Sequence, residues 1–142
     1  EGTVQQLFEQ NTAIAAKPLD PAIRVRMMLD AYMRWGLAHP NAYQLVYSVP
    51  RIGSDTFWPE GANLSTTCYD IFSGEVVRLE AAGRLRQGDA HSVAQVLWVS
   101  SHGLVAMING RPTYNWSSSE DLMKVALDGL MNGLVVDPQG RA

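Results

Sequence analysis

The sequence predicts an all-helical domain of six helices, in which the last two helices pair with their copies to form a four-helix dimer interface. Signals for the starts and ends of helices recur at helix-length intervals, whereas strand signals are scarce and no internal repeat is visible. The last two predicted helices are apolar on more than one side, so each has a second surface that must be covered.

Length and composition point to one cytoplasmic domain. Residues 1–142 are predicted to form a single domain, because a chain of this length buries roughly 70% of the surface that its unfolded form exposes. The net charge of -3 and the lack of a dense run of lysine and arginine indicate that this segment does not itself bind a phosphate backbone. Cys68 is the only cysteine, so we expect a buried thiol in a reducing compartment rather than a disulfide or a catalytic nucleophile. No signal peptide is visible at the start of the sequence.

The first three helices are delimited mainly by prolines. Apolar residues recur at helical spacing in the first helix, which ends at Lys17-Pro18. Asp20 is the expected N-cap of the second helix, and Pro21 suits its first position because the fixed φ and missing N–H cost nothing there. Pro40 opens the third helix and Pro50 closes it. The expected bounds are 3–16, 21–39 and 41–49.

The last three helices follow a loop rich in helix breakers, RIGSDTFWPEG. The fourth helix carries an apolar stripe at helical spacing, formed by Cys68, Phe72, Val76 and Leu79. Gly88 and Asp89 separate the fourth helix from the fifth. A run of serines before Glu120 and Asp121 announces the sixth helix, which is expected to stop at Pro138. The expected bounds are 62–82, 90–109 and about 120–136.

The fifth helix contains no Asp, Glu, Lys or Arg over residues 92–110, which is nearly the length of a membrane span. Its polar residues make it poorly suited to lipid, so we expect a helix buried in protein and no membrane contact. These polar residues are Gln95, Ser100, Ser101, His102 and Asn109.

Both faces of the fifth helix are apolar at 100° per residue. One face contains Ala94, Trp98, His102 and Val105, and the other contains Val93, Val96, Ser100, Gly103, Leu104 and Met107. Glycine costs a helix interior about 1 kcal/mol relative to alanine, so we interpret Gly103 as a point of close approach to another helix; the alternative is a merely tolerated glycine.

The sixth helix repeats this pattern of two faces. Large residues form one face, namely Met123, Leu127, Leu130 and Leu134, and mostly small residues form the other, namely Leu122, Ala126, Gly129 and Gly133. Six helices cannot easily cover both sides of the last two, whereas a twofold axis would bury the extra side against a second copy. We therefore predict a homodimer. Its expected interface residues are Val96, Ser100, Gly103, Leu104, Met107, Leu122, Ala126, Gly129 and Gly133.

The inward face of the fifth helix is predicted to meet aromatic and sulfur-bearing side chains. The candidate cluster comprises Met28, Tyr32, Trp35, Tyr69, Phe72, Trp98, Ser101, His102 and Val105. Two interpretations stay open: a filled core, or the wall of a cavity for a mostly apolar ligand, which methionine suits because it adapts to varied shapes. His102 is likewise either a structural residue bonded to a backbone carbonyl or Ser101, or the polar group that orients a ligand.

Catalysis is not expected. His91 and His102 lie about 16 Å apart along one helix, too far to share a metal or substrate atom. The HExxH, CxxC, GxSxG and phosphate-loop motifs are absent. His39 suits a helix end, and we expect no catalytic residue, metal or cofactor. Among the charged residues, we expect Glu75 to face solvent or an arginine, and Arg24 to belong to a solvated face.

Three sequence segments resemble those of one protein family. They are Ala38-His39-Pro40 followed by Tyr43 and Leu45, within LDAYMRWGLAHPNAYQLVYSVP; the helix end Glu80-Ala-Ala-Gly-Arg-Leu-Arg86; and Trp98-x-x-x-His102-Gly103-Leu104. In this order and spacing they resemble the C-terminal domain of TetR-type bacterial transcriptional regulators, in the subgroup named for its Trp-His-Gly motif. The resemblance in layout spans the whole chain.

The resemblance implies a ligand-binding and dimerisation domain with a six-helix TetR-type fold. It favours the cavity interpretation of the aromatic cluster and implies a small hydrophobic or aromatic effector. Family members carry an N-terminal helix-turn-helix that reads an operator, so operator DNA is expected only through such a domain in a longer parent protein. We expect the first helix to transmit ligand binding to that domain. The alternative is a structural helical dimer with a filled core and no ligand.

Overall fold

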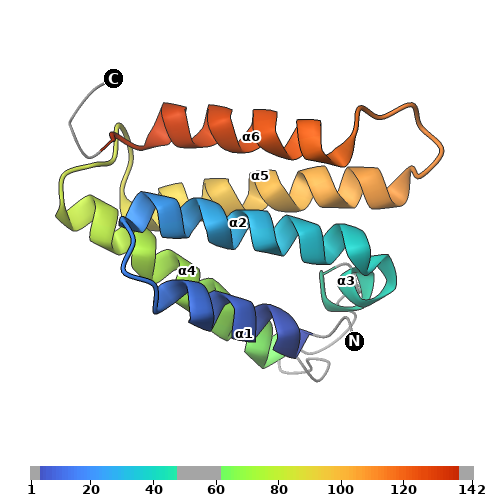
Figure 1. The fold of residues 1–142 in the computed structure, drawn as a ribbon, viewed down its shortest axis with the longest axis horizontal. Coiled ribbons are helices and arrows are strands. Elements are labelled where there is room, and N and C mark those ends of the chain that lie inside the picture. Colours follow the sequence, from blue (N-terminus) through green and yellow to red (C-terminus); the bar gives the residue numbers. More distant parts are fainter. Residues whose placement is uncertain (1–3, 48–61, 138–142) are drawn as a thin grey trace.

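The computed structural model describes residues 4–47 and 62–137, and within them it contains six α-helices (Figure 1). The all-helical prediction is confirmed, with each described bound within a few residues of expectation. The helices are α1 (Val4–Ala15), α2 (Pro21–Ala38), α3 (Pro40–Tyr47), α4 (Ala62–Ala81), α5 (Ala90–Gly110) and α6 (Ser119–Leu134). The expected start at Thr3, the end of the third helix at Val49, the breaker-rich loop and the stop at Pro138 lie outside the described residues.

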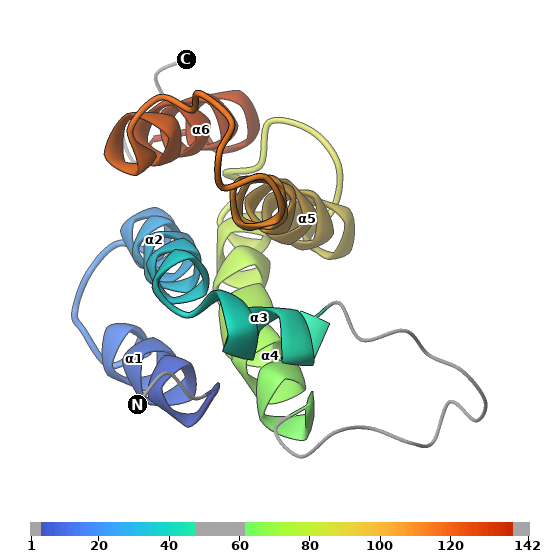
Figure 2. The same ribbon diagram turned by 90° about the vertical axis from the view of Figure 1, so that its right-hand side faces the viewer.

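Helices α2, α5 and α6 run side by side along the long axis, and α1 and α4 lie below them in the view of Figure 1. Figure 2 shows α4 crossing the other helices steeply, and α4 packs against α1, α2 and α5. Because α4 contacts three neighbours, one of its faces closes the space between α1, α2 and α5.

The expected helix caps at α2 and α6 are present. The Asp20 carboxylate accepts a hydrogen bond from the Ala22 N–H at 3.0 Å, with Pro21 in the first helical position. The Ser118 hydroxyl accepts from the Asp121 N–H at 3.1 Å, ahead of two acidic residues in the first turn of α6. Each cap satisfies a backbone donor that the helix itself leaves unpaired.

Helix α6 ends at Leu134, two residues earlier than predicted. Val135 forms an antiparallel bridge with Leu85, and the Val136 N–H donates to the Arg84 carbonyl at 2.8 Å. Pairing with the loop between α4 and α5 pulls the backbone out of the helix, and sequence periodicity carries no sign of this contact.

Arg84 ties that loop to the start of α2. Its guanidinium contacts both carboxylate oxygens of Asp20, at 2.5 and 3.0 Å, and its Nε donates to the Val136 carbonyl at 2.9 Å. The hydrogen bond from Arg84 is the main cause that lowers the pKa of Asp20 below its ordinary value. One arginine thereby joins the ends of α2, α4 and α6.

The buried face of α5 differs in phase from the prediction. Leu97, expected on neither face, is fully buried, and Val93, expected on the outer face, is 3% exposed. An apolar helix has no polar stripe from which its buried side could be predicted. Packing against α2 and α4 determines which side of α5 is buried. No helix among the described residues is both long and apolar enough to span a membrane.

Candidate functional site

A small cavity lies where α1, α2, α4 and α5 meet. Its volume is about 40 Å³, enough for a few water-sized spheres. Nine described residues line it: Leu7, Asn11, Met28, Leu29, Tyr32, Cys68, Tyr69, Phe72 and Trp98. Six of these nine side chains carry neither a hydroxyl nor an amide, so the wall is mostly apolar.

Helical spacing brings these residues to one side of each helix. Leu7 and Asn11 are one turn apart on α1, Met28 and Tyr32 are one turn apart on α2, and Phe72 follows Cys68 by one turn on α4. Contacts between aromatic rings connect the parts of the wall that α4 and α5 supply. The ring centroids of Tyr69 and Trp98 lie 5.4 Å apart, and those of Tyr69 and Phe72 lie 6.0 Å apart, within the range of favourable tilted ring pairs.

Asn11 is the amide in this apolar wall. It is 5% exposed, and its Nδ2 donates to the Cys68 carbonyl at 3.3 Å. Its Oδ1 is buried and has no hydrogen-bond partner among the described residues. Burial also raises the pKa of the Cys68 thiol to about 11, so this buried cysteine is a neutral thiol rather than a nucleophile at neutral pH, as expected.

The predicted ligand-binding residues divide into two groups. Met28, Tyr32, Tyr69, Phe72 and Trp98 line the cavity. The remaining four, Trp35, Ser101, His102 and Val105, are absent from its lining. Leu7, Asn11, Leu29 and Cys68 also line the cavity and were not predicted from the sequence, because their placement depends on how α1, α2 and α4 pack together.

Three of the four outlying residues gather around Tyr43 on α3. The His102 ring stacks on Tyr43 with centroids 5.4 Å apart, and the Trp35 ring lies 6.2 Å from it. A Cβ added at Gly36 would lie 2.8 Å from atoms of both Tyr43 and Val105, so these two side chains flank the glycine. Ser101 is also buried, and its hydroxyl has no partner among the described residues.

A chain of hydrogen bonds joins the Tyr43 cluster to the cavity wall. The Tyr32 and Tyr43 hydroxyl oxygens lie 2.8 Å apart, and both contact His102 Nδ1, the Tyr32 hydroxyl at 3.3 Å. Burial lowers the pKa of His102, which favours the neutral ring at neutral pH, in which Nδ1 can accept a hydrogen bond from a tyrosine hydroxyl. Two tyrosine hydroxyls thus contact His102 Nδ1, a contact that neither of the two interpretations left open by the sequence had named.

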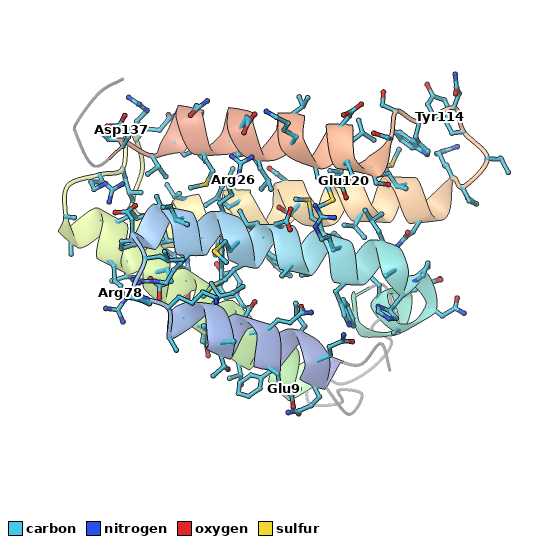
Figure 3. The ribbon with its side chains drawn as sticks, in the orientation of Figure 1. Glu9, Arg26, Arg78, Tyr114, Glu120 and Asp137 are labelled. Atoms are coloured by element: carbon cyan, nitrogen blue, oxygen red, sulfur yellow. The ribbon has the colours of Figure 1, made fainter. Side chains whose placement is uncertain are left out.

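No described part of the chain covers the outer faces of α5 and α6. Exposed large apolar side chains gather there: Val96, Val99 and Met107 on α5, and Val125 on α6. Tyr114, also exposed, sits on the loop between these helices (Figure 3). A Cβ added at Gly103, Gly129 or Gly133 would meet nothing within 4 Å. No part of the described chain therefore makes the close helix approach that the sequence analysis expected at Gly103.

Ion pairs occupy the opposite side of α6, facing α2. Arg26 and Asp128 are 2.7 Å apart, and Arg34 pairs with Glu120; Figure 3 shows Arg26 and Glu120 in the space between these helices. Elsewhere, no group of three or more His, Cys, Asp or Glu side chains within residues 4–47 and 62–137 is arranged to hold a metal ion. The charged side chains of α6 thus pair with α2, whereas no described residue contacts the positions above Gly129 and Gly133.

Comparison with known protein families supplies an identification. A family described as the tetracyclin repressor-like C-terminal domain matches residues 25–130, most of the chain. The chain belongs to this family. Comparisons with curated proteins and with solved structures found no match.

C-terminal domains of tetracyclin repressor-like regulators typically bind effectors and dimerise, and the family is not enzymatic. The matched region includes most of α2 and the whole of α5, but it begins after α1. The two cavity residues that α1 contributes, Leu7 and Asn11, therefore lie outside the part of this tetracyclin repressor-like domain that the family describes.

Proposed function

We propose that this tetracyclin repressor-like domain senses a small, mostly apolar effector in the cavity between α1, α2, α4 and α5, and dimerises through α5 and α6. The observation that carries the proposal is an aromatic-walled cavity at the meeting point of four helices, with five of the predicted ligand-binding residues in its wall. Pockets of this composition suit apolar molecules held by a few polar groups. The Trp98, His102 and Gly103 pattern supports placing the domain in the Trp-His-Gly subgroup.

The size of the cavity favours an effector that enters by displacing side chains. A cavity of about 150 Å³ binds benzene, whereas this one measures about 40 Å³. Met28 and Leu29 line the cavity and are almost fully buried, and the flexible thioether of Met28 is the wall group best suited to repack around a ligand. The same small volume is the observation that favours the alternative, a structural dimer with a filled core.

Thermal denaturation with a panel of hydrophobic compounds separates the two functions. An effector at 100 times its dissociation constant stabilises the domain by about 2.7 kcal/mol, whereas a filled core gives no compound-dependent shift. Leu29→Phe, which adds ring atoms inside the cavity, is expected to abolish the shift. Val77→Phe introduces the same side chain at an exposed position of α4 and is expected to retain the shift. A shift that survives Leu29→Phe at full size places the binding site elsewhere.

The proposed dimer interface consists of the nine residues predicted from the sequence, together with the neighbouring Val99 and Val125. Exposed apolar side chains on adjacent helices support it, since monomeric proteins rarely leave such groups gathered on one surface. The open space above Gly129 and Gly133 supports it too, because a partner helix could approach closely there.

Gly129→Gln is expected to convert the dimer to a monomer. A Cβ at this position meets no described residue within 4 Å, so folding should be retained, while the longer side chain would hold off a partner helix. Gly74→Gln on α4 is the matched control, because Gly74 is also an exposed helical glycine with open space above it. Light scattering should give twice the 15.6 kDa chain mass for the unaltered protein and the control, and 15.6 kDa for Gly129→Gln. A Gly129→Gln variant that stays dimeric would rule out this face.

Control of DNA binding would pass through α1 to a helix-turn-helix domain preceding it in a parent protein. Dimeric readers of this kind place their recognition helices about 34–36 Å apart, or a multiple, and an effector acts only if it binds better to a different spacing. The two cavity residues on α1 support this route, because an effector in the cavity would touch that helix directly. Substitutions in α1 that leave effector-induced release of operator DNA unchanged would contradict it.

A further inference from the structure

The cavity wall contains a buried polar atom that has no hydrogen-bond partner among the described residues. Asn11 lies on α1 with 5% of its surface exposed, and its Oδ1 is completely buried without a hydrogen bond among the described residues. Buried side-chain oxygens are nearly always paired with protein or water, so an unpaired one in a cavity is a position where a donor is missing.

The chemistry of the amide determines which atom is left over. Nδ2 lies 3.3 Å from the Cys68 carbonyl oxygen, an acceptor that only the NH₂ end of the amide can satisfy. Reversing the amide would place two oxygens against each other. Oδ1 is therefore the atom that remains, and it can only accept a hydrogen bond.

The other polar groups of the wall do not supply this donor. The Tyr32 hydroxyl contacts Tyr43 and His102, and burial keeps Cys68 as a neutral thiol, a weak donor at best. Asn11 Oδ1 has no partner among the described residues, the wall residues Tyr69 and Trp98 included, so a molecule inside the cavity would supply the missing donor.

We propose that Asn11 is the specificity-determining residue of the cavity and that the effector is a small, mostly apolar molecule that donates one hydroxyl or N–H hydrogen bond to Asn11 Oδ1. This inference rests on the effector binding proposed above. The surrounding aromatic rings and the small volume limit the effector to about the size of a single ring. An acidic effector is disfavoured, because a carboxylate would place a negative charge against an oxygen that can only accept.

Two probes of nearly equal shape test this inference. Phenol carries a hydroxyl donor, and fluorobenzene replaces it with an atom that cannot donate. In calorimetric titrations of the 142-residue chain, phenol is expected to bind about fivefold more tightly than fluorobenzene, the effect of one net hydrogen bond.

Asn11→Leu preserves the approximate shape of the side chain and removes its oxygen. This variant is expected to bind both probes equally, with the affinity for fluorobenzene retained. Thr12→Val is the matched control, since it also replaces a polar side chain of α1 with an apolar one, at an exposed position where the hydroxyl bonds the Phe8 carbonyl. It should keep the fivefold preference. Asn11→Ala serves as a second variant if Asn11→Leu does not give a cooperative unfolding transition.

The outcomes separate this inference from the proposed function. If phenol and fluorobenzene bind the unaltered protein equally well, the cavity binds ligands but Asn11 does not select a donor, and the inference is wrong. A phenol preference that persists in Asn11→Leu and Asn11→Ala assigns the selectivity to another residue and also overturns it. Failure of both probes to bind the unaltered protein contradicts the single-ring effector and, with it, the cavity as the effector site.

Discussion

Replacing Arg24 by methionine is expected to lower the free energy of unfolding by about 3 kcal/mol, because it leaves the Glu75 carboxylate buried without its main partner. Arg24 on α2 contacts Glu75 on α4 at 2.9 Å through both Nε and a terminal nitrogen. The Glu75 side chain is only 4% exposed. The same guanidinium donates to the carbonyls of Lys17 and Leu19, so the substitution also removes the donor that holds the connection between α1 and α2.

Arg78→Met is the matched control, because Arg78 approaches the same carboxylate. Its distance from Glu75 is 3.6 Å, its side chain is 67% exposed, and Figure 3 shows it at the outer edge of α4. We expect this variant to cost less than 1 kcal/mol, as exposed ion pairs do. Chemical denaturation at fixed protein concentration measures both variants. Equal costs for the two variants would show that burial of the pair does not determine its contribution.

The double variant Arg24→Met/Glu75→Leu should recover most of the stability. Replacing a buried ion pair with apolar groups of similar size is often neutral, whereas removing one partner is not. If the double variant is as unstable as Arg24→Met alone, the lost stability comes from the Lys17 and Leu19 carbonyls instead. Both results bear on the shape of the cavity. Arg24 bonds Glu75 on α4 and the carbonyls of the segment that follows α1. Helices α1 and α4 supply Asn11 and Phe72 to the cavity wall.

Helix bounds could be predicted because the signals that set them are local. Asp20 with Pro21, and Ser118 ahead of two acidic residues, act on backbone groups within three positions. The contacts that orient the helices are not local. Arg84 reaches Asp20 across 64 residues of sequence, and Arg24 reaches Glu75 across 51. The expectation of a solvated face for Arg24 was wrong, because its neighbours in sequence gave no sign of α4; Glu75 does face an arginine, as expected.

The cavity could be predicted only in part, because local spacing identifies the faces of helices but not the contacts between distant helices. Aromatic and methionine residues at helical spacing identified one side of α2, α4 and α5, and five of these residues line the cavity. Asn11 could not be identified, because a lone amide on a short amphipathic helix usually faces water. His102 and Trp35 were assigned to the ligand site through their chemistry, but the position of Tyr43 on α3 draws them to a neighbouring cluster.

Gly36→Val is expected to lower the free energy of unfolding by about 3 kcal/mol, and so to lower the melting temperature by about 10 °C. Gly36 is the point where α2, α3 and α5 meet: a Cβ there would lie 2.8 Å from both Tyr43 Cδ1 and Val105 Cγ1. Tyr43 cannot simply move aside, because its hydroxyl bonds Tyr32 and His102. The Gly36 carbonyl also accepts a hydrogen bond from Asn109 Nδ2 at 3.0 Å, which holds the backbone in place.

Gly74→Val isolates the steric effect from helix propensity. Gly74 also lies inside a helix, but a Cβ there would meet nothing within 4 Å, so the same substitution should leave stability unchanged or slightly higher. Thermal unfolding at one protein concentration compares the two variants, and a Gly36→Val protein as stable as Gly74→Val would contradict the close packing at this crossing.

Because Tyr43 links Gly36 to the hydroxyl of Tyr32 in the cavity wall, Gly36→Val should also weaken effector binding, whereas Gly74→Val should not. The side chain added at Gly36 would then affect the cavity by displacing Tyr43, which is hydrogen-bonded to Tyr32 in the cavity wall. Tyr43 would thus shape the effector site without contacting the effector.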